Sequence, residues 1–210
     1  MDLRAALADR RLVAIVRGGD PDAALRTVLA LAEEGIDLIE VSLSSVDALA
    51  VIARSAAELG PHRPIGAGTV LTADDARAAQ DAGAAFAVTP GLGAGADTAR
   101  ELGLPVLAGV MTPTEVITAQ AQGADALKLF PAAHAGGPAY LTALRAPFPD
   151  AAFVPVGGVD LEAARAYLTA GATAVGVGSP LVADAADGGS LSALRRRARA
   201  FRNAVEEATA

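Results

Sequence analysis

Lys128 is the only lysine in this chain, since sixteen of its seventeen Lys and Arg residues are arginine. It stands between two leucines in the apolar stretch 124-ADALKLFPAAHAGG-137. Arginine stays protonated in proteins, whereas a lysine amine in an apolar pocket loses its proton readily and can attack a ketone or aldehyde. A single lysine at such a position therefore predicts a Schiff-base nucleophile. The alternative is a surface lysine whose alkyl stem lies along apolar neighbours.

Glu40 is the carboxylate best placed to assist such an amine. Side chains alternate between faces along the run 37-DLIEVSL-43, so Glu40 shares its face with Ser42 and lies opposite the apolar residues. The same alternation puts Lys128 on one face with Phe130, and both ionisable groups then point to the inside of a closed sheet. A Schiff-base reaction needs a group that moves protons at the carbinolamine and at the substrate hydroxyl, and Glu40 can do this directly or through a water.

Two further polar residues come at the ends of apolar runs. Arg17 follows LVAIV, and Thr69 is the only hydroxyl in 66-GAGTVL-71. Barrel enzymes build their sites at the C-terminal ends of the strands, so we expect these side chains beside Glu40 and Lys128. The structural alternatives are a plain ion pair between Arg17 and Glu40 and an ordinary strand hydroxyl at Thr69.

Two glycine-rich turns near the C-terminus could bind an anion. The stretches 155-PVGGVD-160 and 176-GVGSPL-181 each follow an apolar run and lead toward a helical pattern. Unhindered backbone N–H groups in such turns bind phosphate, and loops after strands seven and eight commonly do so in barrels. Simple tight turns are the alternative. Together with a Schiff-base lysine, the turns favour a phosphorylated keto substrate.

The elements that must position these groups are marked by glycines and caps. Helical segments end in glycine and are followed at once by an apolar run at Gly35, Gly60, Gly83, Gly103, Gly123 and Gly171. Glycine just past a helix accepts the left-handed conformation that closes it. Helix starts are predicted at Asp20-Pro21 and at Thr112, whose capping box is completed by Glu115, with Thr72 and Ser45 in a similar role.

With the runs Leu12–Val16 and Phe153–Val156, this pattern predicts eight strands, each followed by a helical segment. Such units at short spacing predict a compact (β/α)8 TIM barrel, a single domain over residues 1–210 with short N-terminal and C-terminal helices. An open doubly wound sheet is the alternative, although the GxGxxG turn of a dinucleotide-binding sheet is missing.

Composition restricts the function classes. The chain is 52% hydrophobic with 3% aromatics, carries a net charge of −7 and has no cysteine. The charge disfavours nucleic-acid binding, and the cluster Arg195, Arg196, Arg197 and Arg199 is interpreted as a solvated helix face or subunit contact. No apolar run approaches the ~18 residues of a membrane span. We expect a soluble cytoplasmic protein without membrane or nucleic-acid partners.

The motifs together resemble those of the 2-keto-3-deoxy-6-phosphogluconate (KDPG) and 4-hydroxy-2-oxoglutarate (KHG) aldolases, class I pyruvate aldolases of small (β/α)8 fold. Their order and spacing carry the resemblance from about Leu12 to Val182. The matching motifs are IVRG at Ile15–Gly18, IEVSL at Ile39–Leu43, IGAGTVL at Ile65–Leu71, VTPGL at Val88–Leu92, LKLFPA at Leu127–Ala132, PVGGV at Pro155–Val159 and GVGSPL at Gly176–Leu181.

The resemblance implies residue roles and partners. Lys128 would be the Schiff-base lysine and Glu40 the general acid/base. Arg17 and Thr69, with Pro90 nearby, would hold the pyruvate carboxylate and shape its pocket. Phe130 would pack beside the lysine. Backbone groups around Gly157, Gly158, Gly178 and Ser179 would bind the phosphate. The resemblance also implies a homotrimer that needs no metal or organic cofactor and acts in carbohydrate metabolism of the Entner–Doudoroff type.

Two departures from the family pattern concern specificity. Ser44 stands where many KDPG enzymes have Arg, so carboxylate binding would depend more on Arg17. Val156 stands where the family usually has Thr, just before the glycine pair. In this feature the chain is more similar to the family branch that acts on the C4 epimer, 2-keto-3-deoxy-6-phosphogalactonate. No role is assigned to His62 or His134.

The predicted reaction is reversible cleavage of a 2-keto-3-deoxy-6-phospho sugar acid to pyruvate and glyceraldehyde 3-phosphate. The alternatives are cleavage of 4-hydroxy-2-oxoglutarate to pyruvate and glyoxylate, a phosphate-binding barrel isomerase or synthase, and a non-catalytic barrel that binds a phosphorylated metabolite.

Overall fold

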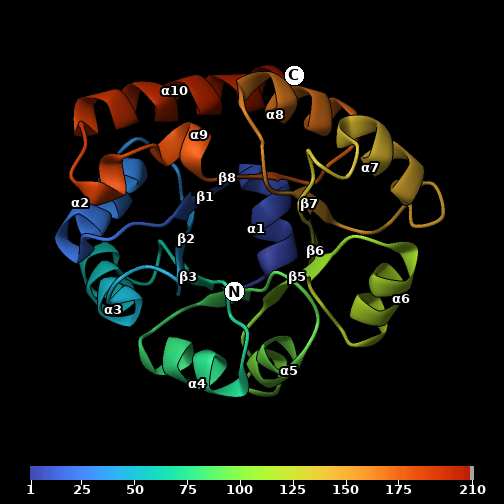
Figure 1. Ribbon diagram of the computed structural model, residues 1–210, viewed down its shortest axis with the longest axis horizontal. Helices are drawn as coiled ribbons and strands as arrows, with labels where there is room; N and C mark the ends of the chain where they lie inside the picture. Colours follow the sequence, from blue (N-terminus) through green and yellow to red (C-terminus); the bar gives the residue numbers. More distant parts are fainter. Residues whose placement is uncertain (209–210) are drawn as a thin grey trace.

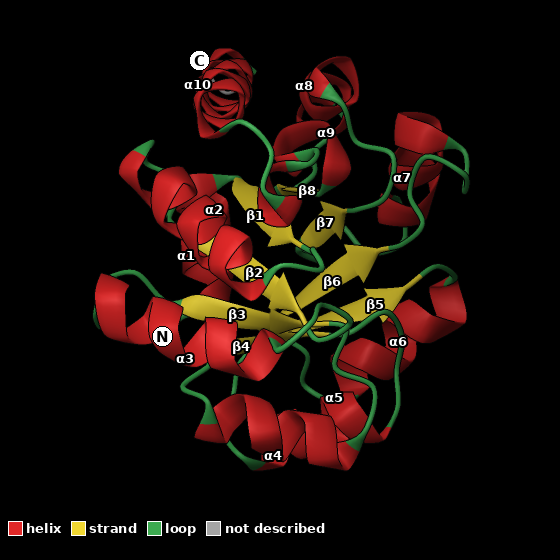
Figure 2. Cartoon of the chain, turned by 60° about the vertical axis from the view of Figure 1, so that its left-hand side comes forward, coloured by secondary structure: helices red, strands yellow, loops and turns green. Residues whose placement is uncertain are grey.

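Eight parallel strands pair in the order β7-β6-β5-β4-β3-β2-β1-β8 in the computed structural model, which describes residues 1–208 (Figure 2). The strands are β1 (Leu12–Val16), β2 (Leu38–Ser42), β3 (Ile65–Gly68), β4 (Phe86–Val88), β5 (Val106–Val110), β6 (Ala126–Leu129), β7 (Phe153–Pro155) and β8 (Val175–Val177). A bridge between Val156 and Gly176 links the two ends of this order. The sheet is therefore a nearly closed barrel, which confirms the predicted (β/α)8 architecture.

Helices surround the barrel and alternate with its strands (Figure 1). They are α1 (Leu3–Arg10), α2 (Pro21–Glu33), α3 (Ala48–Leu59), α4 (Ala73–Asp81), α5 (Ala94–Glu101), α6 (Pro113–Ala121), α7 (Gly137–Arg145), α8 (Leu161–Thr169), α9 (Ser179–Val182), the 3-10 turn η1 (Ala185–Asp187) and α10 (Leu191–Glu207). The terminal helices differ in length, because α1 has 8 residues and α10 has 17. None of these helices within residues 1–208 is long and apolar enough to cross a bilayer.

Most of the predicted helix boundaries are confirmed. The glycines predicted to close helices all have φ between +69° and +89°, at Gly35, Gly60, Gly83, Gly103, Gly123 and Gly171. Asp20 caps α2, and Thr72 and Thr112 form complete capping boxes on α4 and α6. These local signals therefore fix where a helix stops and the next strand begins.

Ser45 was wrongly predicted as a helix cap. The turn after β2 is longer than expected, so Asp47 occupies the cap position of α3 and makes no side-chain cap bond. The Ser45 hydroxyl instead accepts a hydrogen bond from the Gly18 N–H at 3.3 Å. This bond ties the loop after β1, which carries Arg17, to the loop after β2.

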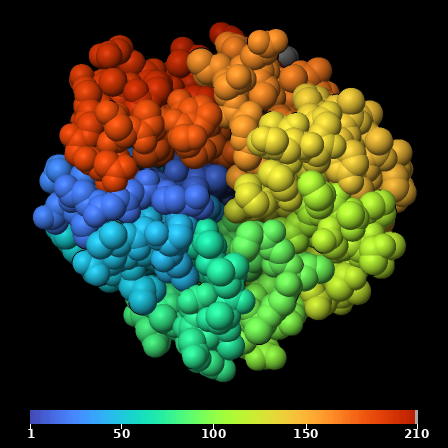
Figure 3. Space-filling view, viewed as in Figure 1, coloured from blue at the N-terminus to red at the C-terminus, as the bar shows by residue number. Residues whose placement is uncertain are grey.

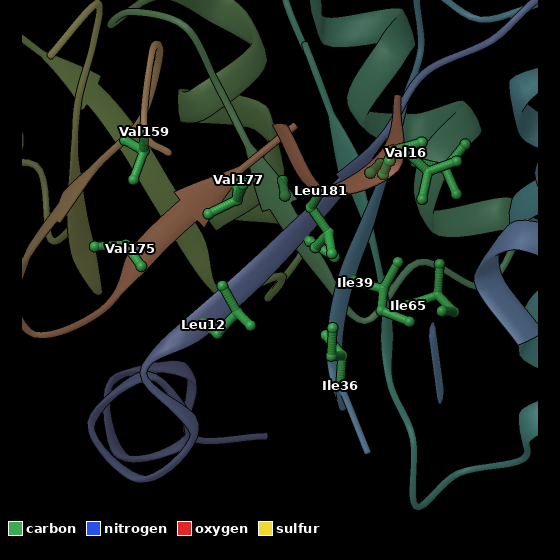
Figure 4. Close-up of a cluster of buried hydrophobic side chains, with 14 of the residues drawn as sticks. Leu12, Val16, Ile36, Ile39, Ile65, Val159, Val175, Val177 and Leu181 are labelled. Atoms are coloured by element: carbon green, nitrogen blue, oxygen red, sulfur yellow. The ribbon is translucent and has the colours of Figure 1, made fainter. Parts of the chain in front are cut away.

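Strand alternation divides the core into two layers. The layer inside the barrel contains one set of strand residues, and Leu3 and Leu7 of α1 belong to it. The larger layer lies between strands and helices and includes Leu12, Ile39 and Val175 (Figure 4). Every strand therefore has one face toward the lumen and one toward the helices, and a polar lumen side chain is an exception to be explained.

The C-terminal helix packs across the junction between the last and first units. In Figure 1, α10 runs beside α8 and α2, and Figure 3 shows the C-terminal segment directly against the N-terminal one. Glu34, just after α2, accepts hydrogen bonds from Arg199 at 2.7 and 2.9 Å and from Arg195 at 3.2 Å. Two arginines of the basic cluster thus pair within the chain, beside the place where the barrel closes.

Candidate active site

Glu40 and Lys128 are the two charged side chains buried among residues 1–208, with exposed fractions of 2% and 6%. Glu40 is in register with Ile15 of β1 and Gly66 of β3, and Lys128 with Gly109 of β5 and Val154 of β7. The side chain next to Lys128 on its own face, Ala126, belongs to the inner layer of the core. The structure therefore places both ionisable groups in the lumen, as the alternation predicted.

Glycines on β3 and β5 allow two close approaches near this polar pair. A Cβ on Gly68 would lie 2.6 Å from Glu40 Oε1 and 2.9 Å from its carboxyl carbon. A Cβ on Gly109 would lie 2.1 Å from the carbonyl carbon of Pro90. The small residues of β3 and β5 thus let the Glu40 carboxyl lie over one strand and the Pro90 turn approach the other.

Burial in the lumen raises the pKa of Glu40 above its ordinary value of 4.5, and the positive charges of Lys128 and Arg17 oppose this rise. Glu40 takes part in no side-chain ion pair or hydrogen bond within residues 1–208. The ion pair between Arg17 and Glu40, which was the structural alternative for these two residues, is therefore not formed. The carboxyl is therefore available to hold and exchange a proton.

Lys128 lies against the aromatic ring of Phe130, two residues along the chain. Its Nζ is 5.2 Å from the ring centroid, within the range of a cation–π contact. Phe130 itself is 39% exposed and lines a surface cavity. The ring therefore contacts the buried amine and is also partly open to solvent.

A hydroxyl cluster of Ser42, Ser44 and Thr69 lies at the ends of β2 and β3. Ser42 Oγ is 2.8 Å from both Ser44 Oγ and Thr69 Oγ1, and it accepts a hydrogen bond from Arg17 Nε at 3.4 Å. Sequence reasoning put Ser42 on the lumen face but gave it no role. Its hydrogen-bond partners Arg17, Ser44 and Thr69 lie just after three different strands. Alternation along one strand cannot predict which of these residues come together.

Thr69 adopts an unusual backbone conformation just beyond β3. Its φ is +60°, in the left-handed region that a β-branched residue rarely enters and that costs about 1–3 kcal/mol. The backbone N–H of the next residue, Val70, donates to Val88 O at 3.2 Å. The surrounding structure therefore holds the Thr69 hydroxyl beside Ser42, although the left-handed backbone is unfavourable for a threonine.

A cavity of about 280 Å³ opens between β1, β7 and β8. Its lining includes Arg17, Phe130, Val156, Gly157, Gly158, Gly178 and Ser179. None of the backbone N–H groups of these last four residues donates a hydrogen bond to another group in the described part of the chain. The two glycine-rich turns thus share one cavity with Arg17 and leave free donors for an anion.

Part of the cavity lining is apolar. Ile15 and Val156 belong to it, and Val156 fills the space above Gly176, where a Cβ would lie 2.6 Å from Val156 Cγ2. Ser44 is exposed, and its hydroxyl contacts Ser42. Pro90 lines a different hollow, together with Leu71.

His62 and His134 are both exposed. Residues 1–208 contain no group of three or more His, Cys, Asp or Glu side chains that could hold a metal ion.

These groups suit carbonyl chemistry on an anionic substrate. A buried amine and a proton-carrying carboxyl share one lumen, an arginine contacts the hydroxyl cluster, and unpaired backbone N–H groups line the cavity that this arginine also lines. An amine so placed can form an imine with a ketone, and the flanking groups can bind an anion at each end of the substrate.

Comparisons with known proteins agree with this chemistry. Residues 3–193 match the model of the KDPG and KHG aldolase family. A 2-dehydro-3-deoxy-phosphogluconate aldolase of Pseudomonas aeruginosa is 43% identical over 143 residues, which are 66% of this chain and 63% of that protein. The alignment thus spans less than two thirds of that relative's length.

Other relatives match over nearly the whole chain. A 2-dehydro-3-deoxy-6-phosphogalactonate aldolase of Escherichia coli is 38% identical over 94% of this chain and 95% of its own. The structure of a KDPG aldolase from Legionella pneumophila, with pyruvate captured as a covalent carbinolamine intermediate, has a TM-score of 0.87. It is 29% identical and covers 94% of this chain and 97% of its own.

Proposed function

The chain belongs to the KDPG and KHG aldolase family, and on that premise we propose that it is a class I aldolase. It reversibly cleaves a 2-keto-3-deoxy-6-phospho sugar acid, of the gluconate or galactonate series, to pyruvate and glyceraldehyde 3-phosphate. The observation that carries the proposal is the burial of Lys128 and Glu40 in one lumen without an ion pair between them. Relatives named as phosphogluconate and phosphogalactonate aldolases support the substrate class.

In the proposed mechanism the Lys128 amine attacks the C2 ketone and gives a carbinolamine. Glu40, in its protonated form, donates a proton to the carbinolamine hydroxyl, and water leaves to give the iminium ion. The raised pKa of Glu40 favours the protonated form needed at this step. The carbinolamine of pyruvate captured in the Legionella pneumophila enzyme supports this first half of the reaction.

Cleavage then uses the ionised form of Glu40. The carboxylate accepts the proton of the C4 hydroxyl, the C3–C4 bond breaks, and its electron pair moves into the iminium to give an enamine. Glyceraldehyde 3-phosphate leaves with its new aldehyde group. Protonation of the enamine at C3 gives the imine of pyruvate, and hydrolysis releases pyruvate and restores the amine.

The remaining site residues bind the two anionic ends of the substrate. Arg17 and Thr69, with Pro90 shaping the pocket, hold the carboxylate beside C2, while Phe130 packs on the lysine. Backbone N–H groups of Gly157, Gly158, Gly178 and Ser179 hold the phosphate, which their unpaired state and shared cavity support. Ser44 and Val156 influence which substrate is preferred.

A coupled assay for pyruvate release tests the function directly. The substrates are the phosphogluconate-derived and phosphogalactonate-derived keto acids and 4-hydroxy-2-oxoglutarate. We expect turnover of at least one phosphorylated keto acid to exceed that of 4-hydroxy-2-oxoglutarate, because only the former can use the glycine-rich cavity. Ligand-dependent stabilisation without pyruvate release from any substrate would instead indicate a non-catalytic barrel.

We further propose that residues 1–210 act as one domain and that the protein is a cytoplasmic homotrimer in carbohydrate metabolism of the Entner–Doudoroff type. Size-exclusion chromatography with light scattering should give three times the 20.8 kDa chain mass. A monomeric mass would remove the trimer from the proposal without affecting the aldolase activity.

A further inference from the structure

Ser42 lies at the centre of the hydroxyl cluster and is fully buried. Its Oγ contacts Ser44 Oγ and Thr69 Oγ1 at 2.8 Å each, and it lies 3.4 Å from both Arg17 Nε and the Ser44 backbone N–H. A serine hydroxyl has one hydrogen to donate and two lone pairs to accept. The Arg17 guanidinium can only donate, so it occupies one lone pair of Ser42, and the two hydroxyl contacts at 2.8 Å share the remaining lone pair and the hydrogen. Ser42 therefore donates in one of these two contacts and accepts in the other.

The direction of these two bonds decides what Thr69 can do. If Ser42 donates to Ser44, Thr69 must donate to Ser42, and Thr69 then presents only lone pairs to a ligand. If Ser42 donates to Thr69, the hydrogen of Thr69 is free to point elsewhere. A carboxylate accepts hydrogen bonds and donates none, so it can bind Thr69 only in the second arrangement.

Arg17 is oriented by the same hydroxyl. The guanidinium always donates, and its Nε is directed to Ser42 Oγ. No other hydrogen bond of Arg17 occurs within residues 1–208, so its two Nη groups remain free beside the cavity that Arg17 lines. One buried hydroxyl therefore contacts both groups to which carboxylate binding is assigned.

Resting on the proposed function, we propose that Ser42 is a positioning residue for the substrate carboxylate. Ser44 donates to Ser42, Ser42 donates to Thr69, and Thr69 donates to the carboxylate. Ser42 accepts from Arg17 Nε, which turns the Nη groups toward the same anion. The left-handed backbone of Thr69 fits this role, because the position of its hydroxyl is held against a local preference.

The test compares pyruvate binding in variants that keep or remove the hydroxyl. Pyruvate is trapped on Lys128 by borohydride, and the pyruvate concentration for half-maximal trapping is measured by mass spectrometry. We expect it to rise about tenfold in Ser42→Ala and Ser42→Val and to stay within about threefold of the unmodified protein in Ser42→Thr. In turnover assays KM should rise while kcat changes less than about threefold.

Two controls separate positioning from a general loss of structure. Ser55→Ala removes a hydroxyl that is equally buried but has no hydrogen-bond partner in the described chain, and it should leave trapping unchanged. Hydroxyacetone is a ketone without a carboxylate, and its trapping should not differ between the unmodified protein and Ser42→Ala. If Ser42→Val does not fold, the comparison of Ser42→Ala with Ser55→Ala remains.

Equal half-maximal pyruvate concentrations in Ser42→Ala and the unmodified protein would overturn the role of Ser42 and leave the aldolase proposal intact. An equal loss with pyruvate and hydroxyacetone would also overturn it, since the effect would not concern the carboxylate. Failure of the unmodified protein to trap pyruvate would refute the proposed function itself and this inference with it.

Discussion

Lys128 and Glu40 are carried by strands that lie on different sides of the barrel, yet both point into its lumen. Strand alternation predicted this orientation from the sequence, because it needs only the local pattern of polar and apolar residues. The same rule put Ser42 on the lumen face but could not reveal its bonds to Ser44 and Thr69. Those bonds depend on the left-handed turn at Thr69 and on the loop after β2.

Replacement of the lysine by arginine tests the need for an amine. Lys128→Arg should fold and lose turnover by more than about a thousandfold, because a guanidinium cannot lose its proton to become a nucleophile. Pyruvate release and circular dichroism measure the two properties. The double variant Lys128→Arg, Arg196→Lys restores one lysine at an exposed site and should remain inactive. Activity in either variant would move the nucleophile away from position 128.

The raised pKa of Glu40 predicts how stability depends on pH. Because the folded state binds this proton more tightly than the unfolded state, ionisation of Glu40 lowers stability as pH rises above 4.5. Glu40→Gln lacks this ionisation, so its stability relative to the unmodified protein should increase from about pH 4 to about pH 8. Urea unfolding at both pH values measures the difference.

The control for this prediction is Glu101→Gln, which removes an exposed carboxyl. It should show a much smaller change with pH. If Glu40→Gln instead became less stable relative to the unmodified protein at higher pH, the ionised carboxylate would be stabilised by its cationic neighbours. Glu40 would then act mainly as an electrostatic partner of Lys128 and Arg17.

At the level of elements, the glycines of β3 position the carboxyl. Gly68→Ala would place a Cβ 2.6 Å from Glu40 Oε1, so the carboxyl must shift. We expect turnover to fall by about tenfold or more, with a smaller effect on the melting temperature. Gly91→Ala is the matched control, because a Cβ there has open space. Equal activity of the two variants would show that the exact place of the carboxyl is unimportant.

Helix caps and closing glycines could be read from the sequence because each depends on one to four neighbouring residues. Thr112 with Glu115 and the glycine at position 35 are examples. Ser45 failed as a cap because the length of the loop after β2 decides which residue begins α3. The length of this loop depends on contacts with other loops, such as the hydrogen bond from Gly18 to Ser45. Such contacts join residues that are far apart in the sequence.

At the level of the whole molecule, α10 stabilises the junction between the first and last units through Glu34. Hydrogen bonds from Arg199 and Arg195 lower the pKa of Glu34 to about 2, although its burial opposes this. A lowered pKa adds stability above the ordinary value of 4.5, and this stability is lost as pH falls toward about 2.

Glu34→Gln should therefore have a lower melting temperature than the unmodified protein at pH 7, and the difference should shrink as pH approaches 2. Thermal unfolding followed by circular dichroism measures it. Glu58→Gln is the control, since Glu58 is exposed and forms no ion pair in the described chain. A constant difference across this pH range would mean that the paired charge of Glu34 is not what holds α10.

The number of strands and their parallel order followed from the repeated strand–helix pattern, because each unit carries its own signals. The length of the C-terminal helix could not be predicted from this pattern. Helix α10 is stabilised by packing on α8 and α2 and by the hydrogen bonds of Arg195 and Arg199 to Glu34. Those contacts join residues more than 150 positions apart.

Borohydride reduction in the presence of pyruvate, followed by mass spectrometry of the digested protein, tests the Schiff-base mechanism most directly. One reduced pyruvyl group should appear on the peptide that contains Lys128, and no such adduct should form in Lys128→Arg. An unchanged mass of the Lys128 peptide, with the protein folded and pyruvate in excess, would contradict the mechanism.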